Sequence, residues 1–349
     1  MAFSVPILGY YDHNNAGDEA FKLAFSGALG NTPHQFVKSL PVDKEIPLAL
    51  FGGGALLNQY FVRHLSKVER IHVVGCSFPY GPKDIQIFEP VKNQIVSLYL
   101  RSRRDVEAAR AAGYDAKFIP DMVFSVPPTA GMTLDQLVTA AALPPRGFHP
   151  DRKKLFVFLS GDYWINYLQG DRKRHESIEL LKERIAKTLD VAAHDYDIIM
   201  PSMSVWYNAR DYIFAGEVLK RMKQPERVCL VERYIDAADL LSVLAQTDCA
   251  VISMKYHGLV FGMRNGRVCI NIGSTRKTLD LMDDFGVSDL TFNPNKDTSD
   301  KLISLLARTG EASLQEQIAS TAEVWTAQAV TTMHQAMDGV RQDCAQLAD

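Results

Sequence analysis

The sequence predicts an α/β protein with two domains, each built around a parallel sheet. Short apolar runs recur along the chain, and each is followed by small or polar residues and then by helical spacing. Strands of parallel sheets have this composition because helices cover both faces, so neither face alternates with polar residues. A length of 349 residues exceeds what one core usually supports, which favours two domains of ordinary size.

The elements follow one another in a regular order. The predicted strands are "VPILGYY", "PLALF" and "IHVVG" in the first half and "LFVFL", "DIIMP", "VCLV", "CAVI" and "VCINI" in the second. Between Pro127 and Lys154, two Pro-Pro pairs flank one short predicted helix, and proline disfavours helix, so we expect the domain junction there. After Phe292 only helical spacing remains. We therefore predict domains over 1–130 and 154–310, a linker over 131–153, and a helix over 311–349 that packs across both domains.

Composition excludes several classes of partner. The formal net charge of -3 provides no positive field for nucleic acid or acidic lipid. The five cysteines show no CxxC pair, which is typical of reduced, mostly buried thiols in the cytosol. No run of 18 apolar residues occurs. We expect a cytoplasmic protein without a transmembrane segment, with peripheral contact to a membrane left open.

The first loop whose residues suit binding or catalysis is "GYYDHNNAGDEAFKLAF", Gly9 to Phe25. A strand is expected to end near Tyr11 and a helix to begin around Asp18. Asp18 and Glu19 at a helix start can simply satisfy backbone amides and complement the helix dipole. Alternatively, Asn15, Asp18 and Glu19 hydrogen-bond sugar hydroxyls, and one carboxylate serves as a general base.

The second loop is "FGGGALLNQYF", which follows the strand "PLALF". Gly53 and Gly54 let the backbone approach a ligand closely, or they serve only a tight turn from strand to helix. The pattern is neither GxGxxG nor a P-loop, so it supports nucleotide binding only weakly.

The third loop, "SMKYHGLVFGMRNG", carries a lysine and a histidine where the strand "CAVI" should end. If the extended conformation continues, Ser253, Lys255 and His257 share one face, and "GLVFGMRNG" forms a helix that ends at Gly266. A lone histidine is more often structural than catalytic. Here a hydroxyl, an ammonium and an imidazole lie between a buried strand and a helix start, which suits anion binding and proton transfer.

Two further segments carry basic residues. "VCINIGSTRKTLDLMDDFG" repeats the strand-to-helix design, with Arg276 and Lys277 at the helix entrance. Two adjacent cationic turns indicate a dianionic ligand. Arg101, Arg103 and Arg104 precede a helix that we expect to be capped near Asp105. Such arginines are usually solvated, so we expect at most one of them to contact a ligand.

Taken in order, these segments resemble the polysaccharide pyruvyl transferase family. The correspondence covers "GYYDHNNAGDEAF", "FGGGALL", "GCSFPYGP", "RSRRDVEAARAAG", "IPDMVF", "DAADLLSVLAQTDCAVISMKYHGLVFGMRNGRVCINI" and Lys277. No single motif is decisive, and the ordered set is fairly specific. The resemblance implies two Rossmann-like domains facing a cleft as in GT-B glycosyltransferases, with the acceptor side amino-terminal and the donor side carboxyl-terminal.

The resemblance also implies a reaction. The enolpyruvyl group of phosphoenolpyruvate would pass to a pair of glycan hydroxyls and form a pyruvate ketal, in cell-surface or exopolysaccharide biosynthesis. The acceptor would be a glycan or a lipid-linked oligosaccharide. Phosphoenolpyruvate acts as donor substrate, and neither a separate cofactor nor a metal is expected.

Residues of this chain can be assigned to that reaction. His257 is the predicted acid that protonates the methylene carbon, and Asp18 or Glu19 is the predicted base. The predicted donor site contains Ser253, Lys255, Gly258, Ser274, Arg276 and Lys277, whose cations neutralise phosphate and carboxylate. The predicted acceptor site contains Asn15, Gly53, Gly54, Tyr163 and Trp164, with the two aromatic rings stacking on a sugar.

The chain departs from the family pattern twice. Lys255 stands where the family commonly has arginine, and lysine keeps the charge but loses the bidentate fork. Asp162 lies in "FVFLSGDYWINY", where many members have an arginine after the strand. Two other hypotheses therefore stay open: a GT-B glycosyltransferase that uses a nucleotide sugar, and a glycan-binding relative that has lost catalysis.

Overall fold

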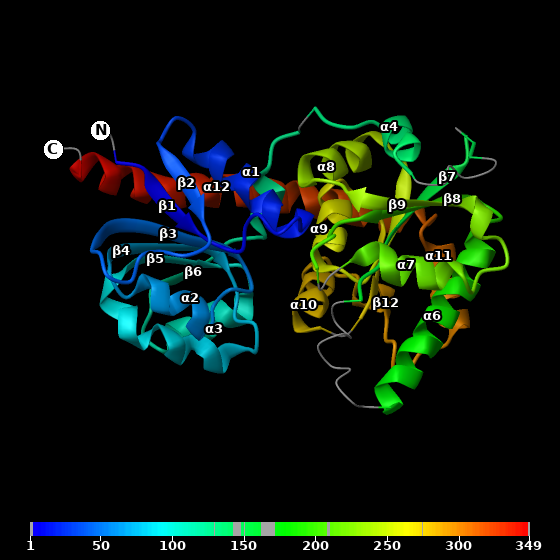
Figure 1. The fold of residues 1–349 in the computed structure, drawn as a ribbon, viewed down its shortest axis with the longest axis horizontal. Coiled ribbons are helices and arrows are strands. Elements are labelled where there is room, and N and C mark those ends of the chain that lie inside the picture. The colour runs from blue at the N-terminus through cyan, green and yellow to red at the C-terminus, as the bar shows by residue number, and fades with distance from the viewer. Residues whose placement is uncertain are drawn as a thin grey trace. The chain divides into compact units, whose positions relative to one another are not determined.

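The computed structural model describes residues 3–128, 130–141, 148–149, 151–161, 172–207, 210–273 and 275–347. Their contacts divide the chain into two compact units, each an α/β structure with one sheet (Figure 1). Unit 1 contains the residues up to His13, Asp18–Pro127 and the chain from Val324 onward. Unit 2 contains Asn14–Gly17 and Pro128–Glu323.

The sheet of unit 1 has six parallel strands in the order β2-β1-β3-β4-β5-β6. The strands are β1 (Val5–Leu8), β2 (His34–Val37), β3 (Ile46–Gly54), β4 (Val68–Cys76), β5 (Ile95–Leu100) and β6 (Ala116–Phe118). The central strands β3 and β4 are buried over most of their length, as expected for strands covered on both faces. Because parallel strands end at one edge, the loops after β1, β3, β4 and β5 gather there.

Helices cover both faces of this sheet. They are α1 (Ala16–Leu29), α2 (Gln59–Val62) and α3 (Arg103–Ala111), with 3₁₀ turns η1 (Arg63–Leu65), η2 (Pro82–Gln94) and η3 (Met122–Ser125). Figure 1 shows α2 and α3 on one side of the sheet and α1 on the other. Phe51, Val73, Phe88 and Leu98 belong to the apolar core that strands and helices share.

The sheet of unit 2 also has six parallel strands, in the order β12-β11-β10-β7-β8-β9. The strands are β7 (Lys153–Phe158), β8 (Tyr196–Ser202), β9 (Val228–Tyr234), β10 (Cys249–Ser253), β11 (Cys269–Ile272) and β12 (Thr291–Phe292). The helices are α4 (Leu134–Thr139), α6 (Arg172–Ala192), α7 (Asp211–Leu219), α8 (Ala237–Gln246), α9 (Tyr256–Arg264), α10 (Arg276–Asp284) and α11 (Ser299–Arg308), with 3₁₀ turns η4 (Pro225–Arg227) and η5 (Ser288–Leu290).

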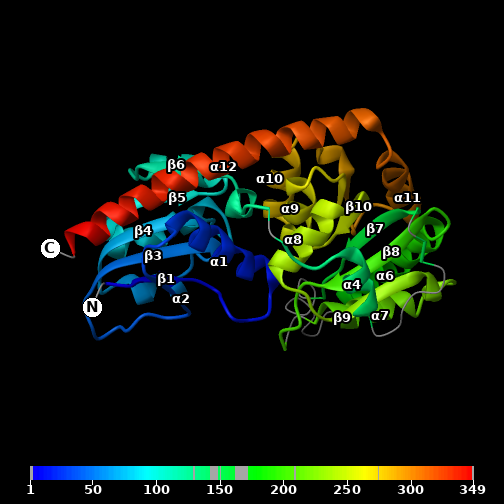
Figure 2. The same cartoon turned by 90° about the horizontal axis from the view of Figure 1, so that it is seen from above.

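Two helices contribute residues to both units. The first residues of α1, Ala16 and Gly17, belong to unit 2, and the helix continues in unit 1. The carboxyl-terminal helix α12 (Ala312–Gln346) is one continuous helix, which Figure 2 shows in orange and red. It belongs to unit 2 up to Glu323 and to unit 1 from Val324.

The end of α12 is fixed to β4 by a polar network in which His72 and Asp343 are buried. Arg70 grips the Asp343 carboxylate with two hydrogen bonds, of 2.7 Å to Oδ2 and 2.8 Å to Oδ1. His72 contacts the same Oδ2 through Nε2 at 2.9 Å and Ser97 Oγ through Nδ1 at 2.8 Å. Because a carboxylate can only accept, Nε2 carries the proton and Nδ1 accepts from Ser97.

The predicted strands all coincide with observed strands in whole or in part, whereas the helix starts expected at Asp18 and near Asp105 were placed two to three residues too late. The helix expected at Asp18 begins at Ala16, because the Asn15 side chain caps it by accepting from Gly17 N at 3.2 Å. The helix expected to be capped near Asp105 begins at Arg103. The Asp105 carboxylate is buried and instead accepts from Phe78 N at 2.9 Å.

The described part of the segment predicted as a linker belongs to unit 2. Its short helix α4 begins with a capping box between Thr133 and Gln136. Just before it, Met132 N donates to Asp239 of α8 at 2.8 Å, which fixes this segment to unit 2.

Candidate functional site

The turn after β10 carries the first group of predicted residues. Ser253 ends the strand and is fully buried, and its hydroxyl accepts from Lys255 N at 3.0 Å and donates to Lys255 O at 2.7 Å. These bonds close the turn so tightly that α9 begins at Tyr256. The prediction that Ser253, Lys255 and His257 share one extended face is therefore wrong, and His257 lies in the first turn of a helix.

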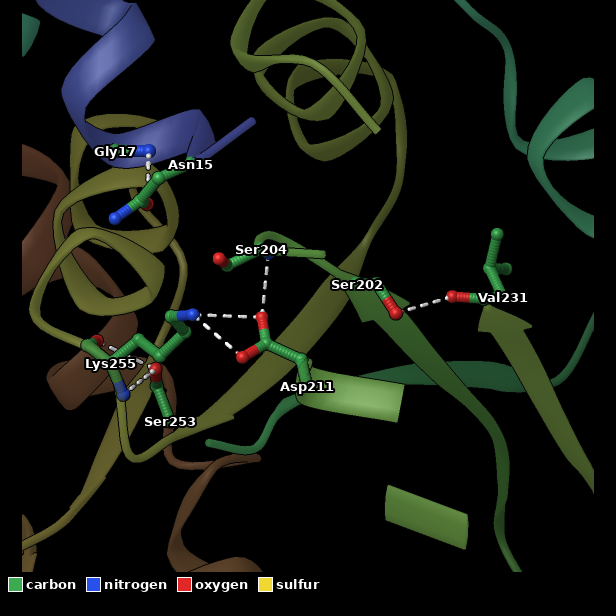
Figure 3. Close-up of polar contacts among 8 residues, drawn as sticks. All are labelled: Asn15, Gly17, Ser202, Ser204, Asp211, Val231, Ser253 and Lys255. Carbon is green, nitrogen blue, oxygen red and sulfur yellow. Dashed lines mark hydrogen bonds and ion pairs between the residues drawn. The ribbon is translucent and has the colours of Figure 1, made fainter. Parts of the chain in front are cut away.

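Lys255 forms an ion pair that the sequence did not indicate. Its Nζ lies 2.7 Å from Asp211 Oδ1 and 2.8 Å from Oδ2, with the lysine side chain 12% exposed and the aspartate side chain 3% exposed. Asp211 is the first residue of α7, and its Oδ2 also accepts from Ser204 N at 2.8 Å (Figure 3). The lysine predicted as a donor-binding cation thus already has a carboxylate as counter-charge.

The segment Asn14–Gly17 completes this region of unit 2. Asn15 and Ser204 form an isolated antiparallel β-bridge, and Ala16 N donates to Met203 O at 2.8 Å. Figure 3 shows Asn15 and Gly17 at the start of α1, and the Lys255 ammonium pointing toward the Asp211 carboxylate. Asn15, predicted for the acceptor site, therefore lies in the same unit as the residues predicted for the donor.

The His257 imidazole packs directly against Gly17. A Cβ atom added to Gly17 would lie 2.2 Å from His257 Nδ1, far inside any contact distance that real atoms adopt. The ring also meets Tyr256 edge-on, with centroids 5.1 Å apart, and lies 6.1 Å from Phe261. Only glycine at position 17 leaves room for the imidazole in this orientation.

The second cationic turn adjoins the first. Strands β10 and β11 are neighbours, with Ser253 opposite Asn271, so α9 and α10 begin side by side. Arg276 and Lys277 open α10, and Lys277 Nζ lies 5.7 Å from the centre of the Tyr256 ring. Arg276 Nε lies 3.6 Å from Asp280 Oδ2. The structure thus brings the two predicted turns together.

Gly258 has a packing role in this unit. A Cβ there would lie 2.3 Å from Ser253 Oγ and 3.0 Å from Phe158 Cβ, so glycine lets α9 approach the ends of β10 and β7. The remaining predicted residues of this half, Tyr163, Trp164 and Ser274, lie outside the described residues, as does Asp162.

Unit 1 contains the two predicted carboxylates, which have different surroundings. Glu19 Oε1 accepts from Asp12 N at 2.5 Å and from His13 N at 3.3 Å, and Oε2 lies 2.7 Å from Lys22 Nζ. These contacts hold the turn before α1, where Asp12 adopts a φ of 58°. The Glu19 carboxylate therefore stabilises this turn.

The glycine loop is shaped mainly by packing against α1. A Cβ on Gly53, whose φ is +84°, would lie 2.4 Å from Phe21 Cδ2. Gly54 has more space, and a Cβ there would lie 3.7 Å from Asp18 Oδ1. Of the two glycines, Gly54 is therefore the one beside a carboxylate that could serve the acceptor.

Buried polar groups fix the same edge of unit 1. Arg101 Nη1 donates to Asp121 Oδ2 at 2.9 Å and its Nε to Ser77 Oγ at 3.1 Å, so this arginine supports loops after β4 and β6. Burial raises the pKa of Tyr11, whose hydroxyl donates to Gly52 O at 2.9 Å. Burial likewise raises the pKa of the Cys76 thiol to about 12, which excludes a thiolate nucleophile there at neutral pH.

Comparison with known proteins identifies the family. The model of the polysaccharide pyruvyl transferase family matches residues 15–276, from the Asn15 cap to Arg276. The chain belongs to this family. Members of this family are transferases, and the matched range includes Asp211, Lys255 and His257 of unit 2. No curated protein matches the chain by sequence.

Solved structures share the fold of this pyruvyl transferase family member at low sequence identity. UDP-GlcNAc 2-epimerase from Neisseria meningitidis, bound to UDP-GlcNAc, is 8% identical with a TM-score of 0.60, covering 98% of this chain and 99% of its own. HepE from Anabaena, in complex with UDP-glucose, is 13% identical with a TM-score of 0.59, covering 97% and 99%. The glycotransferase of kitacinnamycin is 11% identical with a TM-score of 0.52, covering 98% and 100%.

These likenesses confirm the predicted GT-B-like α/β fold class and its long carboxyl-terminal helix. Among the described helices, none combines the length and the apolar composition that a membrane crossing requires.

Proposed function

We propose that the protein transfers the pyruvyl group of phosphoenolpyruvate to two hydroxyls of a glycan acceptor and forms a ketal during synthesis of a cell-surface polysaccharide. Membership of the pyruvyl transferase family supports the reaction type. The observation that carries the assignment to a site is the contact between two cationic helix starts in unit 2, through Lys277 and Tyr256. The imidazole of His257 belongs to the first turn of α9.

The donor requires positive charge at two places because it carries both a phosphate and a carboxylate. Arg276 and Lys277 open α10, and Lys255 precedes α9. The backbone N–H groups of a helix's first turn have no partner within the helix and attract anions. The adjoining starts of α9 and α10 therefore offer two helix termini, with cationic side chains beside them, to one small molecule that has two anionic groups.

The reaction balances without an oxidant or reductant. A first hydroxyl oxygen bonds to C2 of the donor while the methylene carbon C3 gains a proton and becomes a methyl group. A second hydroxyl then replaces phosphate at C2, which breaks the bond between C2 and the bridging oxygen, and this oxygen leaves with the phosphate. Of the two hydroxyl protons, one is matched by the proton gained at C3 and the other leaves with phosphate. His257 is the proposed donor of the C3 proton, and Asp18 the proposed acceptor of a hydroxyl proton.

An assay with purified protein tests this function. We expect incubation with phosphoenolpyruvate and an oligosaccharide acceptor pool to release phosphate and to add one pyruvate, less one water, to a glycan by mass spectrometry. His257→Asn should reduce turnover by about 100-fold or more, the usual range for general acid catalysis, while phosphoenolpyruvate affinity changes little. Equal turnover by wild type and His257→Asn would remove the acid role.

A second candidate is glycosyl transfer from a nucleotide sugar. The neutralisation of Lys255 by Asp211 favours it, since a less cationic site suits a donor with less charge than phosphoenolpyruvate. The same acceptor pool, incubated with nucleotide sugars, distinguishes the two reactions. Sugar addition without pyruvate addition would replace the first proposal by the second.

A further inference from the structure

The ion pair between Lys255 and Asp211 gives the candidate site an unusual electrostatic character. Both carboxylate oxygens of Asp211 lie within hydrogen-bonding distance of the ammonium, at 2.7 and 2.8 Å. A carboxylate shared in this way cancels most of the field that the lysine would present to an incoming anion. The pair is also nearly buried, so solvent screens it less than it would a surface pair.

Asp211 is held in place independently of Lys255. Its Oδ2 accepts from Ser204 N at 2.8 Å, and its own N donates to Ser204 O at 3.1 Å. Ser204 also forms an isolated β-bridge with Asn15. As the first residue of α7, Asp211 also has its negative charge stabilised at a helix amino terminus. These contacts keep the carboxylate beside Lys255 when an anion arrives.

We propose that Asp211 is a fixed counter-ion that limits the grip of Lys255 on an anionic ligand. In this arrangement Lys255 orients the turn before His257, and Asp211 sets the affinity of the site for anions. The identity of the anion as phosphoenolpyruvate rests on the proposed function. Inorganic phosphate, which that reaction releases, would for the same reason be held less tightly than in a site without the Asp211 charge.

A double-mutant cycle between the two residues tests the inference. Phosphoenolpyruvate and inorganic phosphate would each be titrated by calorimetry into wild type, Asp211→Asn, Lys255→Gln and the double variant. Removing the carboxylate charge should tighten anion binding by about tenfold, and removing the ammonium should weaken it by a similar factor. The double variant should bind within about threefold of wild type, because the pair as a whole adds little net charge.

Matched controls separate charge from damage to the fold. Asn at position 211 can still accept from Ser204 N, so the loop should keep its conformation. Asp300→Asn makes the same change in net charge at an exposed pair with Lys187, 3.1 Å long, and should leave anion affinity unchanged. The double variant is neutral at the pair, which avoids leaving either charge nearly buried and uncompensated.

Two results would overturn the inference. The first is that Asp211→Asn binds both anions no more tightly than wild type does. The second is that the double variant binds as weakly as Lys255→Gln, which would show that Lys255 grips the ligand directly. If wild type binds phosphate but no phosphoenolpyruvate, the proposed donor fails. The phosphate titrations then still decide the role of Asp211.

Discussion

At the residue scale, the contact between Gly17 and His257 makes a sharp prediction. Gly17→Ala places a Cβ where His257 Nδ1 lies, so the imidazole must move. We expect turnover to fall by about tenfold or more, since displacing a catalytic group by about 1 Å is enough for such a loss. Steady-state kinetics with phosphoenolpyruvate would measure the effect.

Gly27→Ala is the matched control because it makes the same change in the same helix. A Cβ there would meet only Pro127 Cδ, at 3.9 Å. Alanine favours helix over glycine, so this variant should be as stable as wild type or more stable, with unchanged turnover. Equal losses in both variants would show that helix α1, rather than the contact with His257, causes the defect.

The sequence identified several residues of this site but not their partners. Lys255 and His257 were predicted from their place after a buried strand, and the structure places them at the helix start there. Asp211 was missed because it lies 44 residues from Lys255, at the start of the helix that follows another strand. Which loops meet depends on strand order, and a single sequence does not state that order. Glu19 was predicted as a base from its position alone, although its contacts give it a role in the turn before α1.

At the element scale, the network that joins α12 to β4 predicts a pH dependence of stability. Burial lowers the pKa of the His72 imidazole, and Asp343 opposes this shift only in part. Burial opposes the charge on Asp343, but hydrogen bonds from Arg70 and His72 outweigh it and lower the pKa of that carboxyl. In both cases the unfolded chain binds protons first as the pH falls, so acid destabilises the folded state.

Stability should therefore fall between about pH 8 and about pH 5.5, the range in which an unperturbed histidine takes up a proton. Denaturant unfolding at the two pH values would measure this fall. His72→Asn should reduce the difference, whereas His194→Asn, which changes an exposed histidine of unit 2, should preserve it. The same pH dependence in His72→Asn as in wild type would contradict the role of this network.

The unit 1 part of α12 makes a second prediction at this scale. Trp325 is nearly buried, and its ring lies 5.4 Å from that of Phe124 and 6.1 Å from that of Phe118. Trp325→Ala should lower the free energy of unfolding by about 3 kcal/mol, as for other large aromatic truncations in cores. Val324→Ala, at the exposed neighbouring position, should change it by less than about 0.5 kcal/mol. Similar losses in both variants would argue against docking through Trp325.

Strands were predictable where both faces are buried, because the sequence of such a strand is a continuous apolar run. The eight predicted runs each overlap an observed strand, but β2, β5, β6 and β12 were not predicted as strands. In β2 and β6 no more than one residue is fully buried, and β12 has only two residues. Helix starts were predicted from acidic residues, whereas the Asn15 side chain caps α1 and begins it earlier.

At the scale of the whole molecule, length and repeated parallel-strand patterns were enough to predict two α/β units. A last helix across both domains was also predicted, and α12 has residues in both units, but nothing in the sequence showed that Asn14–Gly17 belongs with unit 2. Both assignments depend on contacts between segments far apart in sequence, such as Asn15 with Ser204 and Arg70 with Asp343. Apolar residues recur with helical spacing over the whole of α12, which predicts a helix. This spacing does not show which surface the helix packs on.

The central claim is that phosphoenolpyruvate binds at the adjoining starts of α9 and α10. Hydrogen–deuterium exchange with and without phosphoenolpyruvate tests it most directly, with an Arg276→Gln, Lys277→Gln double variant as control. We predict protection of peptides covering residues 253–261 and 275–281 in wild type and little or none in the variant. Protection confined to other peptides, or equal protection in the variant, would contradict the claim.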